Sequence, residues 1–174
     1  MGCEDLFLEK SMTRLQLLKA QGDGVLDQIS SDEQVQWMPN KESNSIAMIV
    51  KHLRGNMKSR WTNFLTDDGE KPDRNRPSEF FINNQPTLEE TRNLWEEGWG
   101  YVFSAIGDLK PSDLSRTITI RSEPLLVMDA ILRQLLHYSG HIGQMVFLGK
   151  MLLDEKWNSL SIPRMPDERY GPES

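Results

Sequence analysis

Two of the three histidines in this 174-residue chain lie four positions apart. His137 and His141 belong to the segment LLHYSGHIGQ, and His52 lies far upstream in IVKHLRGN. Residues i and i+4 share one face of a helix, with Cβ atoms about 5–6 Å apart, so a helix here would project both rings together. The histidines of H-E-x-x-H zinc helices have the same spacing. The pattern therefore indicates a chelating pair, and His52 could supply a third imidazole from a facing helix.

A hydrogen-bonded pair of core histidines is the alternative interpretation, because the segment around His137 is largely apolar. Gly140 and Gly143 lie beside the pair, and each costs about 1 kcal/mol in a helix interior relative to Ala. Their small size would leave room for a close neighbouring helix or for a ligand. Spacing and composition alone leave both interpretations open.

Three imidazoles without a cysteine or an obvious carboxylate would give a metal ion an open coordination sphere. Three protein ligands plus water is the pattern of catalytic zinc, whereas structural zinc has four protein ligands. Because the ligands are neutral, the ion would acidify bound water or a bound thiol. A thiolate is the nucleophilic form of a thiol. Thiol transfer and hydrolysis are both compatible with this site, and the same ligands suit zinc, nickel, copper or iron.

Three further polar residues lie about one helical turn from a histidine. They are predicted to line the wall of a pocket, although an arginine here could instead extend into solvent and a glutamine could bond the backbone. These candidates are Asn56, Arg133 and Gln144.

Other polar groups receive structural interpretations. Arg54 and Arg60 are expected to be surface charges, and Tyr138 points away from the histidine pair and is expected to pack. The segment DDGE, residues 67–70, lacks the ligand spacing of an EF-hand and is predicted to be a turn. The five tryptophans are expected to be anchors of the core.

The elements that must position these residues are predicted to be four helices in one domain that spans residues 1–174. Apolar periodicity and capping signals indicate where each helix lies. Polar and apolar residues alternate with period two in Thr117–Ile120, so this segment is interpreted as an extended connector. Its only expected strand partner is the same segment of a second copy of the chain. A proline-rich, irregular tail begins at about residue 157. The predicted helices span residues 4–29, 44–65, 87–107 and 124–153.

Composition excludes several classes of protein. The net charge of −6 and a pI of about 5.1 argue against nucleic acid, since the basic residues form no patch. No apolar run reaches the roughly 18 residues that a membrane span needs. The single cysteine, Cys3, permits no intrachain disulfide. With no targeting signal in the sequence, a cytoplasmic location is expected.

Four segments carry a resemblance to a known family: SIAMIVKHLRGNMKSRW, FLTDDGEKP, RQLLHYSGHIGQ and WNSLSIP. They resemble the DinB/YfiT-like superfamily, and more narrowly an uncharacterised branch labelled as a domain of unknown function. The resemblance implies an all-α, four-helix bundle with long inter-helix connections, commonly dimeric. It also implies a divalent metal, often zinc or nickel, held by one histidine of the second helix and an H-x-x-x-H pair of the fourth. His52, His137 and His141 match these positions.

Characterised members of the superfamily include thiol transferases that use bacillithiol or mycothiol, and a thiol-dependent isomerase. We therefore expect a metal-dependent homodimeric enzyme that transfers a low-molecular-weight thiol to a small substrate. A non-enzymatic metal-binding dimer with a stress-response role is one alternative. A metal-dependent hydrolase that uses the same site is the other.

Overall fold

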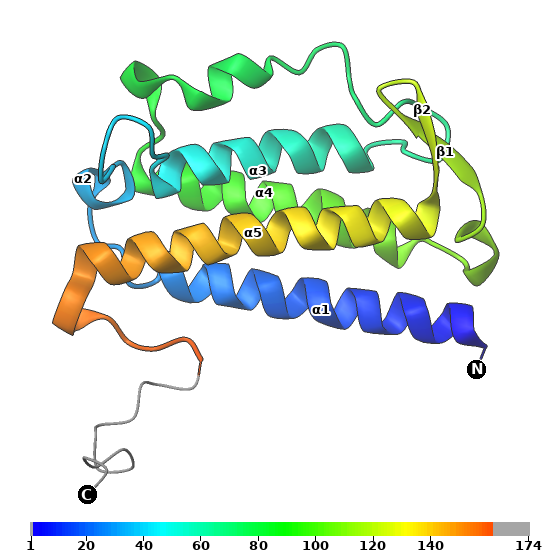
Figure 1. Cartoon of the computed structure of the whole chain (residues 1–174), viewed down its shortest axis with the longest axis horizontal. Helices are drawn as coiled ribbons and strands as arrows, with labels where there is room; N and C mark the ends of the chain where they lie inside the picture. The colour runs from blue at the N-terminus through cyan, green and yellow to red at the C-terminus, as the bar shows by residue number, and fades with distance from the viewer. Residues whose placement is uncertain (1, 162–174) are drawn as a thin grey trace, which may run out of the picture.

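Four long helices lie side by side around one hydrophobic core in the computed structural model, which describes residues 2–161 (Figure 1). The predominantly helical chain predicted from the sequence is confirmed. A short helix, α2 (Asp32–Val35), interrupts the first connection. The long helices are α1 (Cys3–Leu26), α3 (Ile46–Trp61), α4 (Leu88–Gly107) and α5 (Val127–Leu153).

Side-chain caps start two of the long helices where the sequence predicts them. The Ser45 hydroxyl accepts a hydrogen bond from the Met48 N–H at 3.1 Å at the start of α3. At the start of α4, the Glu90 N–H donates to the Thr87 hydroxyl at 3.2 Å, and the Thr87 N–H donates to Glu90 at 2.9 Å. This reciprocal pair is a capping box, which the Thr-x-x-Glu spacing of Thr87 and Glu90 predicts.

The connection between α3 and α4 contains two 3-10 helices, η1 (Arg76–Phe80) and η2 (Ile82–Asn84). In Figure 1 it follows α3 on the side that faces away from α1, and η1 contacts α3. The prolines and polar residues of this segment predict a loop. Its docking on α3 buries Glu79 of η1 against that helix.

A two-stranded hairpin precedes α5 and corrects two predictions. β1 (Thr117–Ile120) is extended as expected, but it pairs antiparallel with β2 (Glu123–Leu126) of the same chain. The fourth long helix therefore begins at Val127, and the predicted start near Pro124 is wrong. Hairpin turns of two residues usually carry Asn-Gly, because both positions need positive φ. Here Arg121 and Ser122 take φ of 56° and 63°, so the usual turn signal is missing from the sequence.

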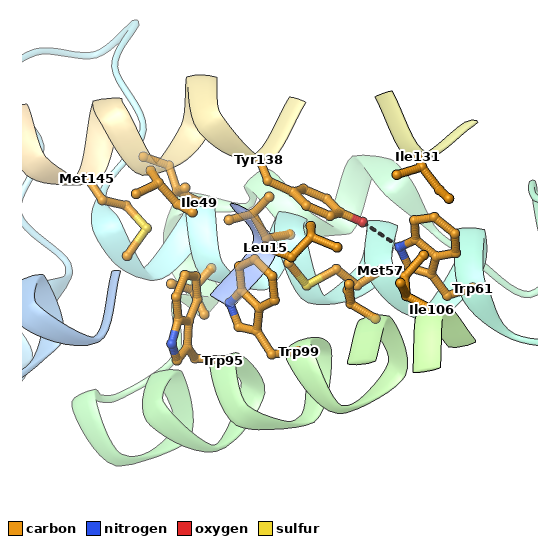
Figure 2. Close-up of a cluster of buried hydrophobic side chains, with 14 of the residues drawn as sticks. Leu15, Ile49, Met57, Trp61, Trp95, Trp99, Ile106, Ile131, Tyr138 and Met145 are labelled. Carbon is orange, nitrogen blue, oxygen red and sulfur yellow. Dashed lines mark hydrogen bonds between the residues drawn. The ribbon is translucent and has the colours of Figure 1, made fainter. Parts of the chain in front are cut away.

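Aromatic side chains fill the centre of the core (Figure 2). Trp95 and Trp99 pack edge to face with ring centroids 5.5 Å apart. The Trp61 indole N–H donates a hydrogen bond to the hydroxyl of fully buried Tyr138 at 2.8 Å, so the prediction that Tyr138 packs is confirmed. Gly22, which weakens α1 locally, is explained by packing, since a Cβ at this position would collide with the Trp95 ring.

The chain leaves α5 through η4 (Asp154–Lys156) and continues as irregular backbone. Trp157 lies against Gly149 of α5, and Leu160 lies against Gly24 of α1. The predicted irregular tail is thus seen as far as residue 161, and residues 162–174 lie outside the described part of the chain. In the described part, no helix combines the length and the hydropathy that a membrane span requires.

Candidate metal centre

Three imidazole rings from two helices point at one another. His52 lies on α3, and His137 and His141 lie on α5. The Nε2 atom of His137 is 3.3 Å from that of His52 and 3.1 Å from that of His141, and one nitrogen of each ring lies within 4.8 Å of the other two. A tetrahedral zinc ion at about 2.0–2.1 Å from its ligands holds nitrogens about 3.3–3.4 Å apart. The two distances from His137 fit this geometry, so the three histidines could hold a metal ion.

Hydrogen bonds fix the orientation of two of the rings. The Nδ1 atom of His52 lies 2.8 Å from a Glu79 carboxylate oxygen, and that of His141 lies 3.0 Å from the Gln144 amide oxygen. Since these oxygens only accept, each Nδ1 carries the proton, and the Nε2 of a neutral ring is left with a free lone pair. The third ring, His137, has a buried Nδ1 with no partner among residues 2–161. The Nε2 atoms of the three rings converge on one point, as metal binding requires.

The surroundings also favour the uncharged form of two of the rings. Burial, with His141, His52 and nearby arginines adding to its effect, lowers the pKa of His137 to about 3. Burial lowers the pKa of His141 as well, with His52 adding to the effect and the Gln144 hydrogen bond opposing it. His137 and His141 are therefore neutral at pH 7. Neutral imidazole is the form that binds metals.

Glu79 of η1 is the functional residue that sequence reasoning missed. It is 6% exposed and accepts hydrogen bonds from His52 and from Arg74, whose Nε lies 2.8 Å and Nη2 3.0 Å from its carboxylate oxygens. Burial raises the pKa of Glu79, but the hydrogen bonds from His52 and Arg74 outweigh it, and the pKa is lowered. Glu79 is therefore a buried carboxylate ion behind the His52 ring. A carboxylate in this position raises the basicity of a metal-binding histidine.

A glycine on α3 makes this contact possible. A Cβ at Gly55 would collide with a carboxylate oxygen of Glu79. The sequence offers no local signal for the pairing, because Glu79 lies 27 residues from His52 in a segment without helical periodicity.

The rings border a cavity of about 550 Å³. Of the predicted wall residues, Asn56 and Arg133 line it, and Asn56 is buried with an unpartnered side-chain oxygen. Gln144 does not line this cavity: it holds His141 and borders a neighbouring hollow. No described part of the chain packs against Gly140 or Gly143, where an added Cβ would meet nothing within 4 Å.

The prediction that Arg60 is a surface charge is wrong. Its side chain is buried, donates to the Gly69 carbonyl and pairs with Glu70 at 3.0 Å. Its spacing from His52, i to i+8 through Asn56, places it on the same helix face, and this signal could have identified it. Arg54, also expected to be a surface charge, is half-buried and pairs with Glu97 on α4.

Comparison with protein families gives one match. Residues 3–166 match the model of a family described as "Protein of unknown function (DUF1572)". The chain belongs to this family. The match spans all four long helices and the three histidines, so the histidine cluster lies inside the region that matches the DUF1572 model. Comparisons with curated proteins and with solved structures return no match.

Proposed function

We propose that the chain is a divalent-metal-dependent enzyme whose ion is held by His52, His137 and His141. The convergence of the three Nε2 atoms is the observation that carries the proposal, and the lowered pKa values of His137 and His141 keep those two rings neutral. Nitrogen ligands without a thiolate or carboxylate suit zinc or nickel. The cluster lies beside a cavity, as a site that binds a substrate requires.

The DinB-like fold assignment belongs to this proposal. It is supported by four long helices with long connections, and by a ligand set drawn from one histidine of α3 and an i, i+4 pair of α5. This is the arrangement that the sequence resemblance implies. A DinB-like bundle would explain why α3 and α5, far apart in the sequence, present their histidines to each other.

The proposed nucleophile is a low-molecular-weight thiol. A divalent ion with three neutral ligands lowers the pKa of a thiol or water that it binds. The protein contributes the orientation of the rings: Glu79 and Gln144 hold two of them in the tautomer that leaves Nε2 free. The cavity offers room for a thiol and a second small substrate beside the rings. Hydrolysis would use the same residues, with water in place of the thiol.

Elemental analysis of untagged protein tests the ion. We expect about one zinc or nickel per chain in the wild type and near none in His52→Ala, because two imidazoles bind far more weakly than three. Arg14→Gln, an exposed change on α1, is the control and should keep the metal. Equal metal contents in wild type and His52→Ala would exclude the three-histidine site.

An activity screen tests the nucleophile. Metal-loaded protein is incubated with low-molecular-weight thiols and electrophiles while free thiol is measured, and in parallel with ester and amide substrates. Thiol loss that depends on the metal and on His52 supports transfer, whereas metal-dependent cleavage without thiol supports hydrolysis. If no metal-dependent rate appears in either panel, the non-enzymatic metal-binding alternative is favoured.

The homodimer stays a prediction. Large apolar side chains are exposed along one face of α5, where a second copy could pack: Leu132, Leu136, Phe147 and Met151. Multi-angle light scattering of the wild type and of Leu136→Lys measures the mass directly. A monomeric wild type would refute the prediction.

A further inference from the structure

The cavity beside the three histidines is lined by side chains of one charge sign. Five arginines border it, and no aspartate or glutamate among residues 2–161 does. The whole chain carries a net charge of −6, so this concentration of positive charge runs against the overall composition. The five arginines are Arg60, Arg74, Arg76, Arg121 and Arg133.

Within the described part of the chain, three of these arginines are paired with carboxylates. Glu70 pairs with Arg60 at 3.0 Å and with Arg121 at 2.8 Å, and Glu79 pairs with Arg74 at 2.8 Å. Among the described residues, these ion pairs set five arginines against two glutamates, so positive charge predominates around the cavity before any metal ion is counted.

The remaining two arginines stand at the mouth of the cavity. Arg76 and Arg133 are exposed and have no carboxylate partner among residues 2–161. Neither therefore has a structural ion pair that would explain its position.

Two amides beneath this mouth have unused hydrogen-bonding capacity. Asn56 and Gln134 are 6% and 3% exposed, both line the cavity, and the side-chain oxygen of each has no partner in the described residues. Buried polar atoms without partners are uncommon in folded proteins, because they give up hydrogen bonds to water. Both free atoms accept hydrogen bonds, so a ligand that carries O–H or N–H groups would supply the missing donors.

The position of Arg121 is set by a strained turn. Arg121 and Ser122 both adopt the left-handed conformation, which is unfavourable for residues other than glycine, and the structure must offset that cost. The Asp68 carboxylate does so by accepting their backbone N–H groups at 2.9 and 2.7 Å. The same turn carries the Arg121 side chain to the edge of the cavity. Strain of this kind is concentrated at functional sites.

We propose that this cavity binds a small anionic substrate through its carboxylate or phosphate group, with Arg76 and Arg133 pairing with the anion. Guanidinium groups bind both kinds of anion through two parallel hydrogen bonds. Asn56 and Gln134 contact the polar body of the molecule, which then lies against the three histidines. The inference rests on the proposed function for the role of the bound molecule, but anion binding itself needs no metal ion.

Isothermal titration calorimetry with inorganic phosphate and with succinate tests the inference. The titrations use the full chain, first stripped of metal with a chelator and then after addition of one equivalent of zinc. We expect saturable binding, weakened on the order of tenfold or more in Arg133→Gln and Arg76→Gln, because each loses a charge-assisted hydrogen bond. Arg14→Gln removes the same charge from an exposed site on α1 and should bind as the wild type does. Comparing the two probes shows whether carboxylate or phosphate is preferred.

Both mouth arginines are exposed, so their variants should fold, and circular dichroism verifies this. Absence of saturable binding of either probe in both metal states overturns the inference, as does equal affinity in Arg133→Gln, Arg76→Gln and the control. Stoichiometric zinc without anion binding would refute this inference and leave the metal site standing. Anion binding that depends on Arg133, in a protein that binds no metal, would support this inference and refute the metal site.

Discussion

Replacing Glu79 with glutamine tests how the second layer of the site controls the metal. Glutamine has nearly the same shape and keeps an oxygen that can accept from the His52 Nδ1–H, so the ring tautomer is preserved. It removes the negative charge that lies 2.8 Å from His52 and from the Arg74 Nε. The change therefore isolates the electrostatic contribution of the carboxylate from its role as a spacer.

The expected losses of metal affinity and of stability follow from the contacts of Glu79 with His52 and Arg74. Loss of an outer partner of a metal-binding histidine lowers metal affinity about 10–100-fold, which corresponds to about 1.4–2.7 kcal/mol. The free energy of unfolding should fall by about 1.5–3 kcal/mol, the usual contribution of a hydrogen bond to a charged group. It should not reach the roughly 3–5 kcal/mol of a fully orphaned buried charge, because Glu70 lies 3.7 Å from Arg74 and still compensates it in part.

Competition titration against a zinc-binding dye measures affinity, and urea unfolding of the metal-free protein measures stability. Glu97→Gln is the matched control, since Glu97 also pairs with an arginine but is 40% exposed and lies away from the histidines. It should lower stability by less than about 1 kcal/mol and leave zinc affinity unchanged. Gly55→Ala is a second variant, which displaces the Glu79 carboxylate without removing its charge, and it should also weaken zinc binding. Equal zinc affinity in Glu79→Gln, Glu97→Gln and wild type would refute the reasoning.

Two further predictions concern stability. Backbone N–H groups of the DDGE turn and of the hairpin turn lower the pKa of Asp68 to about 2, below its value in an unfolded chain, so its stabilising effect is present above about pH 4 and lost as the pH falls through 2. Asp68→Asn should therefore unfold at lower urea concentration than wild type at pH 7, with the gap closing between pH 4 and 2. Asp67→Asn, at an exposed neighbouring carboxylate, is the control and should cost less at pH 7. A constant gap for Asp68→Asn would contradict the assignment. Tyr138→Phe should lower the free energy of unfolding in urea by about 1–3 kcal/mol, because the buried Trp61 N–H loses its acceptor. Tyr101→Phe, at a partly exposed hydroxyl, is the control and should lower it clearly less. Equal losses would show that the buried hydrogen bond is not the cause.

Local patterns in the sequence were sufficient to predict much of the candidate site. The i, i+4 spacing of His137 and His141 and the phase of Asn56 relative to His52 require only that each segment be helical. The caps at Ser45 and Thr87 likewise depend on residues within one turn of the helix start. These features are read correctly from sequence because the interacting groups are close along the chain. The contribution of His52 to the same cluster was implied by family resemblance, since no spacing rule joins residues 85 positions apart.

Only the tertiary structure decided which charged residues face the histidines. Glu79 looks like a loop residue, and Arg60 looks like one of many surface arginines. Both become buried because the α3–α4 connection folds back onto α3, and Gly55 leaves the space for it to do so. The hairpin turn escaped prediction for a related reason, since the Asp68 carboxylate that stabilises its unusual Arg121-Ser122 backbone lies more than 50 residues earlier. Helical phase is set by neighbouring residues, but burial, ion pairing and backbone strain depend on groups that the fold brings together from distant parts of the chain.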